Sequence, residues 1–150
     1  MVKKILIPIC IAIVSCIAVS ILSFTKLSLL FDIPSFLIVP VLPLLYMAGS
    51  FGFRGIGRAY KTAFAKNPEK KDLVFSQAFF RGFSKVLWLF SAVGFVTGLI
   101  GIFSFLNDYE VLGPNLAVAI ITLFYGVLSN LLLVYPFLLS VSGRLSEFSD

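Results

Sequence analysis

The most constraining feature of the sequence is a pair of long apolar runs near its C-terminal end. The first run covers residues 86–106, the second covers 114–141, and a short acidic segment, 107–113, separates them. A helix needs roughly 20 apolar residues to cross a membrane, at a rise of about 1.5 Å per residue. Each run is long enough, so the pair predicts two membrane helices joined as a hairpin.

The composition extends this prediction to the whole chain. The 150 residues are 59% hydrophobic and 13% charged, whereas soluble domains have about 45–50% apolar and about 25% charged residues. We therefore expect an all-α integral membrane protein. The sequence contains no histidine, so histidine-based catalysis and histidine ligation of metals are excluded. We expect no enzyme activity, cofactor, metal or nucleic-acid partner.

Two earlier apolar runs, residues 5–24 and 33–53, bring the expected number of membrane helices to four, in one domain covering residues 1–150. The first run follows two lysines, and two interpretations remain open for it: a cleaved signal sequence or a retained helix. Pro40 and Pro43 lie inside the second run. Prolines in a helix interior remove a hydrogen bond, so we expect this helix to be bent.

The distribution of positive charge predicts the orientation of these helices. Lys and Arg gather in the segment 54–85, whereas the 25–32 connector has one lysine and the 107–113 segment has neither Lys nor Arg. Short loops rich in Lys and Arg stay on the cytoplasmic side of a membrane. We therefore expect both termini and the basic segment 54–85 to be cytoplasmic. The part 73–85 is amphipathic, and we expect it to continue into the third membrane helix.

Small and polar residues recur at three- or four-residue spacing in both runs of the hairpin, which places each set on one helix face. Small residues let helices approach closely in lipid, and polar residues are costly to expose to it. Two interpretations remain open: hydrogen bonding between helices, or the lining of an ion path that faces a partner helix. From the residues alone, the candidates for lining such a path are Thr122, Tyr125 and Ser129, and the small residues of the two stripes include Gly94, Gly98 and Gly126.

Charged residues are missing from the expected membrane depth. The acidic residues closest to the helices, Asp32, Asp108 and Glu110, fall at the expected outer border. By this reasoning the chain has no buried group of its own that could bind and release a proton. If it conducts ions, the titrating carboxylate must come from a partner helix.

Three stretches of the sequence resemble the MotA/TolQ/ExbB family of ion-driven stator and energy-coupling subunits, and the flagellar MotA branch is the most similar. The three stretches occur along the chain in the same order as in the family. The chain differs from MotA in its short 54–85 segment, where MotA has a substantial cytoplasmic domain. The matching stretches are FDIPSFLIV at 31–39, GFVTGLIG at 94–101 and LGPNLAVAIITLFYGVL at 112–128, with a later proline at Pro136.

The resemblance implies a pentameric homo-oligomer in the bacterial inner membrane, around a MotB/TolR/ExbD-like single-helix partner that carries the ion-binding aspartate. It also implies that the third and fourth helices face this partner and that Thr122 matches the family's pore-facing threonine. Gly94, Thr97, Gly98 and Gly126 are then further candidates for the ion path or the partner-facing surface. Gly98, with Thr97 beside it, stands where the family has a threonine in the third helix.

The favoured function is therefore a ring-forming membrane subunit of a proton- or sodium-driven stator or energy-coupling complex, with ions passing at the partner interface. The alternative is a non-conducting scaffold or regulatory membrane protein derived from the same fold. Gly98 in place of a threonine and the short 54–85 segment favour the alternative. A membrane enzyme or small transporter has the least support, because the sequence offers no nucleophile–base pair.

Overall fold

The computed structural model describes residues 2–22, 30–104, 106 and 109–148, and the regular elements within these ranges are all helical. This confirms the predicted all-α class for the described part of the chain. Two π-helical segments, η2 and η3, are continuous with the α-helices around them. In chain order the elements are α1 (Val2–Leu22), α2 (Ile33–Phe36), η2 (Leu37–Val41), α3 (Leu42–Phe64), α4 (Lys70–Ser104), α5 (Tyr109–Ser129), η3 (Asn130–Val134) and α6 (Tyr135–Ser146).

Three continuous helices are long and apolar enough to cross a membrane. They are Ile33–Phe64, Lys70–Ser104 and Glu110–Ser146, with 32, 35 and 37 residues. A fourth apolar helix, Ile5–Ile21, is shorter. The structure thus indicates a membrane protein with three candidate spans, while the fourth crossing and the cytoplasmic side of the termini stay predictions.

Polar sequence continues two of the helices beyond their apolar runs. α4 begins at Lys70, so the stretch 73–85 is continuous with the apolar run that starts at residue 86, as predicted, and a large part of the basic segment 54–85 is helical. α5 begins at Tyr109, so 109–113 forms helix instead of a connector. Within 70–85 the buried residues recur at helical spacing, and a helix of this amphipathic kind can pack on its apolar face without a membrane. The predicted end of the first helix, residue 24, lies outside the described residues.

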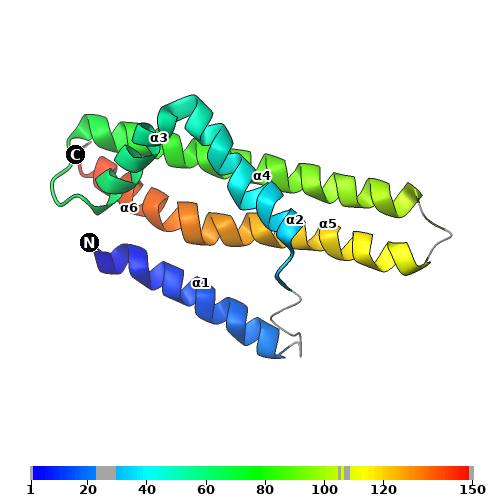
Figure 1. Cartoon of the computed structure of the whole chain (residues 1–150). Coiled ribbons are helices and arrows are strands. Elements are labelled where there is room, and N and C mark those ends of the chain that lie inside the picture. The colour runs from blue at the N-terminus through cyan, green and yellow to red at the C-terminus, as the bar shows by residue number, and fades with distance from the viewer. Residues whose placement is uncertain (1, 23–29, 105, 107–108, 149–150) are drawn as a thin grey trace.

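The second apolar helix is bent, but its sharpest change of direction lies at a glycine and not at the prolines. Gly52 has φ 72° and ψ 156°, a conformation that residues with a Cβ rarely adopt. Pro40 lies inside η2, and Pro43 lies in the first turn of α3. The part of α3 after Gly52 crosses α4 and reaches α6 (Figure 1).

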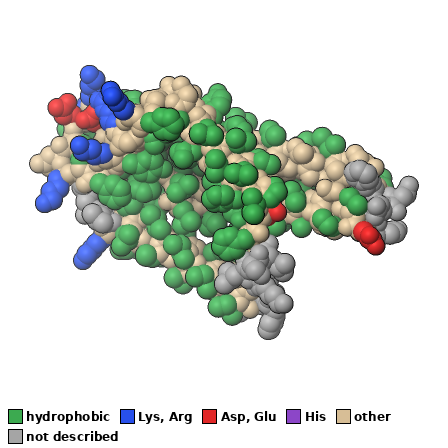
Figure 2. All heavy atoms as spheres, in the orientation of Figure 1, with side chains coloured by type: hydrophobic (Ala, Val, Ile, Leu, Met, Phe, Trp, Pro, Cys, Tyr) green, Lys and Arg blue, Asp and Glu red, His purple; other side chains and the backbone are tan. Residues whose placement is uncertain are grey.

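α4 packs lengthwise against α5 and α6, while α1 contacts α6 and η3 (Figure 1). The start of α1 and the end of α6 lie at one end of the molecule, and the junction of α4 with α5 lies at the other (Figure 1). Lys and Arg side chains gather at the first end, and hydrophobic side chains cover most of the rest of the visible face (Figure 2). We call the first end the base (residues 51–85 and 130–146) and the second end the tip (94–104 and 109–122).

The core of the base is a cluster of aromatic rings. Phe79, Phe80 and Phe83 of α4 are fully buried. Tyr60 of α3 lies edge-on to Phe80 and Phe137, with ring centroids 5.1 and 4.8 Å apart. Buried aromatic side chains bring a large apolar area out of contact with the surroundings. The ring cluster therefore holds α3, α4 and α6 together.

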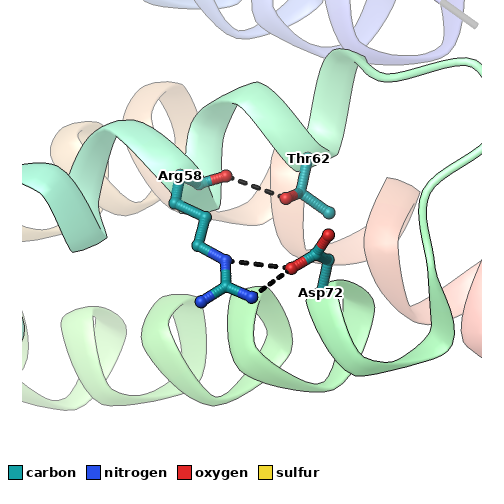
Figure 3. A network of polar contacts seen from close by, with 3 residues as sticks. All are labelled: Arg58, Thr62 and Asp72. Carbon is teal, nitrogen blue, oxygen red and sulfur yellow. Dashed lines mark hydrogen bonds and ion pairs between the residues drawn. The ribbon is translucent and has the colours of Figure 1, made fainter.

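Polar contacts fasten the outside of the base. The Arg58 guanidinium binds the Asp72 carboxylate at the start of α4, and the Thr62 hydroxyl donates to the Arg58 carbonyl at 2.8 Å (Figure 3). Arg144 of α6 donates to three carbonyls at the C-terminal end of α3. The last carbonyls of a helix lack regular i+4 N–H partners and carry partial negative charge, so a cation is well placed there. The acceptors are Thr62 at 3.1 Å, Ala63 at 3.0 Å and Ala65 at 2.9 Å.

Candidate functional site

The predicted glycine and threonine stripes of the hairpin face each other inside one chain. A Cβ added at Gly98 would lie 2.6 Å from the Cβ and 2.9 Å from the Cα of Ala119. Such distances leave no room for a side chain, so α4 and α5 approach closely at this level. A Cβ added at three other glycines would likewise lie too close to a side chain of the facing helix. These pairs are Gly94 with Thr122, Gly101 with Asn115, and Gly126 with Ser91.

Thr122, the candidate for the wall of an ion path, is fully buried in this contact. Its hydroxyl donates to the carbonyl of Ala119 at 2.8 Å, and its methyl group faces Gly94. The Ser91 hydroxyl donates across the two helices to the Thr122 carbonyl at 3.1 Å. Thr122 thus combines close packing with a hydrogen-bonded hydroxyl.

Thr97 and Ser129 lie apart from this central contact. Thr97 is exposed, and its hydroxyl donates to the carbonyl of Val93 at 2.8 Å, on the same helix. Ser129 is buried one position before Asn130, whose amide accepts from Ser84 at 2.6 Å and donates to Gly126 at 2.9 Å. The structure therefore brings Gly94, Gly98, Thr122 and Gly126 together and leaves Thr97 on another face.

Tyr125 has a contact that sequence reasoning did not foresee. Its hydroxyl donates to the Leu30 carbonyl at 2.8 Å and lies 3.4 Å from the Asp32 backbone nitrogen, which donates to it. Its ring lies edge-on to Phe36, with centroids 6.1 Å apart. Tyr125 therefore attaches the start of the second apolar helix to α5.

This contact places the backbone of Asp32 beside Tyr125, while the position of Asp32 at the outer border of the membrane stays a prediction. Asp32 lies beside Tyr125, which is fifteen positions along the helix from Glu110, or about 22 Å at 1.5 Å per residue. Glu110 does lie in the first turn of α5, and Asp108 lies outside the described residues. Asp32 followed by Pro34 marks a helix start in the sequence, but that signal carries no information about depth.

A second feature of the surface is an apolar groove between α1 and α5. Its volume is about 710 Å³, and its lining includes Ile11, Cys16 and Val19 of α1 and Phe124 and Leu128 of α5. Both cysteines of the chain are free thiols. The groove lies outside the contact formed by Gly94, Gly98, Thr122 and Gly126.

Comparison with known proteins adds no relative, since no family model and no curated protein matches the chain. The resemblance to the MotA/TolQ/ExbB family therefore stays a prediction. Within the described ranges, no three His, Cys, Asp or Glu side chains come together in a group that could hold a metal ion. The candidate site thus consists of hydroxyl, amide and carbonyl groups in an apolar setting.

Proposed function

We propose that this protein is a ring-forming membrane subunit of an ion-driven stator or energy-coupling complex, in which its hairpin packs against further copies and a partner helix. The observation that carries the proposal is the uncovered tip. The α4–α5 hairpin extends past the ends of α1 and α2 (Figure 1). Large apolar side chains point outward from both of its helices, including Phe103 at 68% and Ile120 at 56% exposure.

The uncovered tip supports an assembly for a physical reason. Close glycine contacts hold its two helices together, while its outer surface is apolar and carries Val96, Ile100 and Leu116. Surfaces of this kind are covered in a membrane by lipid or by other helices. The small-residue stripe and the resemblance to ring-forming subunits favour other helices.

The alternative, a non-conducting scaffold with the same fold, is favoured by a different observation. Gly94 and Gly98 pack against Thr122 and Ala119 of their own chain, so this surface is already filled. A scaffold needs only such packing. The conducting function additionally needs the ion path to reach the hydroxyl of Thr122, which is fully buried within its own chain.

The assembly can be tested by cross-linking between copies in the membrane. Two single-cysteine variants on a background without Cys10 and Cys16 form a matched pair: Ile100→Cys at the tip, and Leu139→Cys on α6 in the base. Both positions are exposed, at 60% and 65%. We expect Ile100→Cys to form cross-linked multimers and Leu139→Cys to form far fewer. A monomer in native mass spectrometry, with no tip cross-links, would contradict the ring.

The ion path can be tested with Thr122→Val, which removes the hydroxyl and retains a branched side chain against Gly94. We expect ion flux into vesicles that contain the partnered complex to fall at least tenfold while assembly is retained. Thr97→Val serves as the control because Thr97 is exposed and bonded within its own helix. Equal flux in Thr122→Val and wild-type protein would support the scaffold instead.

A further inference from the structure

We propose that Arg81 and Lys85 of α4 bind the phosphate group of an anionic lipid, whose acyl chains lie on the exposed face of α4 beyond Trp88. We call Arg81, Lys85 and Trp88 the lipid triad. The inference goes beyond the proposed function, because it concerns one chain in a bilayer and needs neither a ring nor ion flow.

The first argument is the position of the triad along α4. Lys85 is the last charged residue of this helix, and residues 86–104 are uncharged. They span about 28 Å at 1.5 Å per residue, close to the roughly 30 Å thickness of the hydrocarbon core of a bilayer. A crossing by α4 therefore uses all of this uncharged part, which places Lys85 at the level of the lipid headgroups at one border.

The second argument is the order of the side chains on the exposed face of α4. Arg81, Lys85 and Trp88 are spaced by four and three positions, which places them on one face of the helix. All three are exposed. Further along the helix the exposed side chains are aliphatic, with Leu89 at 65% and Val93 at 61% exposure. Because tryptophan is enriched at membrane–water interfaces, this order matches the headgroup, interface and acyl layers of a leaflet.

The third argument is that the two cations have no acidic partner. Within the described ranges, neither Arg81 nor Lys85 forms an ion pair or a hydrogen bond through its side chain, and the ion pair found there joins Arg58 to Asp72. Asp72 lies nine positions before Arg81, about 13 Å along the helix. Further Lys and Arg side chains gather at the same end of the molecule (Figure 2). The charge of the triad is therefore available to an anionic ligand.

The fourth argument is that a single ligand meets both parts of this face. The guanidinium of Arg81 can donate two parallel N–H groups to phosphate oxygens, and Lys85 adds a point charge. The acyl chains of the same lipid cover Trp88 and Leu89. A soluble anion would contact the cations alone, and an apolar protein surface would leave both cations without a partner. An anionic lipid is therefore the occupant that the face fits.

The inference can be tested with Trp88 as a built-in probe, because the sequence holds one tryptophan. The full chain is placed in vesicles of phosphatidylcholine and phosphatidylglycerol, in which one of the two lipids carries bromine on its acyl chains and quenches tryptophan on contact. We expect brominated phosphatidylglycerol to quench Trp88 well beyond its share of the lipid. The relative affinity for phosphatidylglycerol should fall about fivefold in each of Arg81→Gln and Lys85→Gln, the effect of one cation near an anionic surface.

Two controls accompany these variants, and circular dichroism checks that all of them are folded. Arg81→Lys combined with Lys85→Arg keeps both charges and should keep most of the preference. Ile100→Trp combined with Trp88→Phe moves the probe to an exposed position of the tip, where no preference is expected. Equal quenching of Trp88 by both lipids, or a preference that survives loss of both cations, overturns the inference. So does a Trp88 that neither lipid quenches, because water or another protein then covers this face.

Discussion

The tip and the base of the molecule are held together by different kinds of contact. In the tip, α4 and α5 approach so closely that Gly98 has no space for a methyl group beside Ala119. In the base, Tyr60 and Phe80 fill the space between three helices with aromatic rings, and Arg144 binds the end of α3. The first arrangement depends on the absence of side chains and the second on their volume.

This difference shows how one small chain can form both a two-helix tip and a wider base. Close glycine contacts make a two-helix rod without bulk, which leaves the outside of the tip open to other helices or lipid. The base needs large side chains because α3 crosses α4 after Gly52 and must be supported by α6. Substitutions in the two parts should therefore fail for opposite reasons, overpacking in the tip and cavities in the base.

The largest effect is expected from Phe80→Ala in the base. Phe80 is fully buried and contacts the rings of Tyr60, Phe79 and Phe137. Truncation leaves a cavity and should lower the free energy of unfolding by about 3–5 kcal/mol, measured by denaturant titration in mixed micelles. Phe53→Ala, at a position 77% exposed, should change it by less than about 0.5 kcal/mol. Similar losses at both positions would show that the ring cluster does not support the base.

A smaller effect is expected from Gly98→Val in the tip. The new side chain would push against the Cβ and backbone of Ala119, and overpacking of this kind costs about 1–3 kcal/mol. Gly113→Val is the matched control, because a Cβ at Gly113 meets nothing within 4 Å.

The pair Gly98→Ala and Ala119→Gly makes the test of the tip sharper. Ala119→Gly should relieve only part of the loss caused by Gly98→Ala, since the Cα and nitrogen of residue 119 stay 2.9 and 3.0 Å from the new Cβ. The free-energy effects of substitutions at contacting residues do not simply add. A double-mutant cycle therefore measures the interaction energy between residues 98 and 119. Additive free-energy changes for the two substitutions would contradict the close approach of α4 and α5 at residues 98 and 119.

The smallest effect is expected from Arg144→Lys, which keeps the charge but loses the planar set of donors. Arg144 donates to the carbonyls of Thr62, Ala63 and Ala65, and a lysine cannot reproduce this fork. We expect a loss of about 1–2 kcal/mol and faster proteolysis in the 65–69 loop. The exposed Arg54, changed to Lys, is the control. Equal proteolysis in both variants would indicate that Arg144 does not hold the end of α3.

Much of the fold could be predicted from the sequence, because hydrophobic runs and residue spacing are local properties. The helical hairpin and the shared face of Gly94, Gly98, Thr122 and Gly126 follow from length and helical period. The continuation of the amphipathic stretch 73–85 into the third membrane helix was predicted as well, and α4 begins three residues earlier, at Lys70. A kink or local break was predicted at Pro40 and Pro43, and Pro40 does lie in the π-helical segment η2. The kink at Gly52 was not predicted, because proline is the stronger local signal.

The candidate site was predicted only in part, for a related reason. Spacing shows which residues share a face, but not what that face meets. The spacing therefore left open whether Thr122 faces its own chain or only another protein. In the structure Thr122 faces Gly94 of its own chain. Thr97, one position from Gly98, lies on the exposed side.

The sequence by itself determined that this chain is helical, strongly apolar and built around a hairpin whose helices carry small residues at helical spacing. The tertiary structure decided where along the helices segments that are distant in sequence come into contact. Asp32 and Tyr125 are 93 positions apart, and no local pattern specifies that the start of one helix lies beside the middle of another. Their meeting depends on the packing of η2 against α4 and α5, which brings the backbone of Asp32 to the hydroxyl of Tyr125.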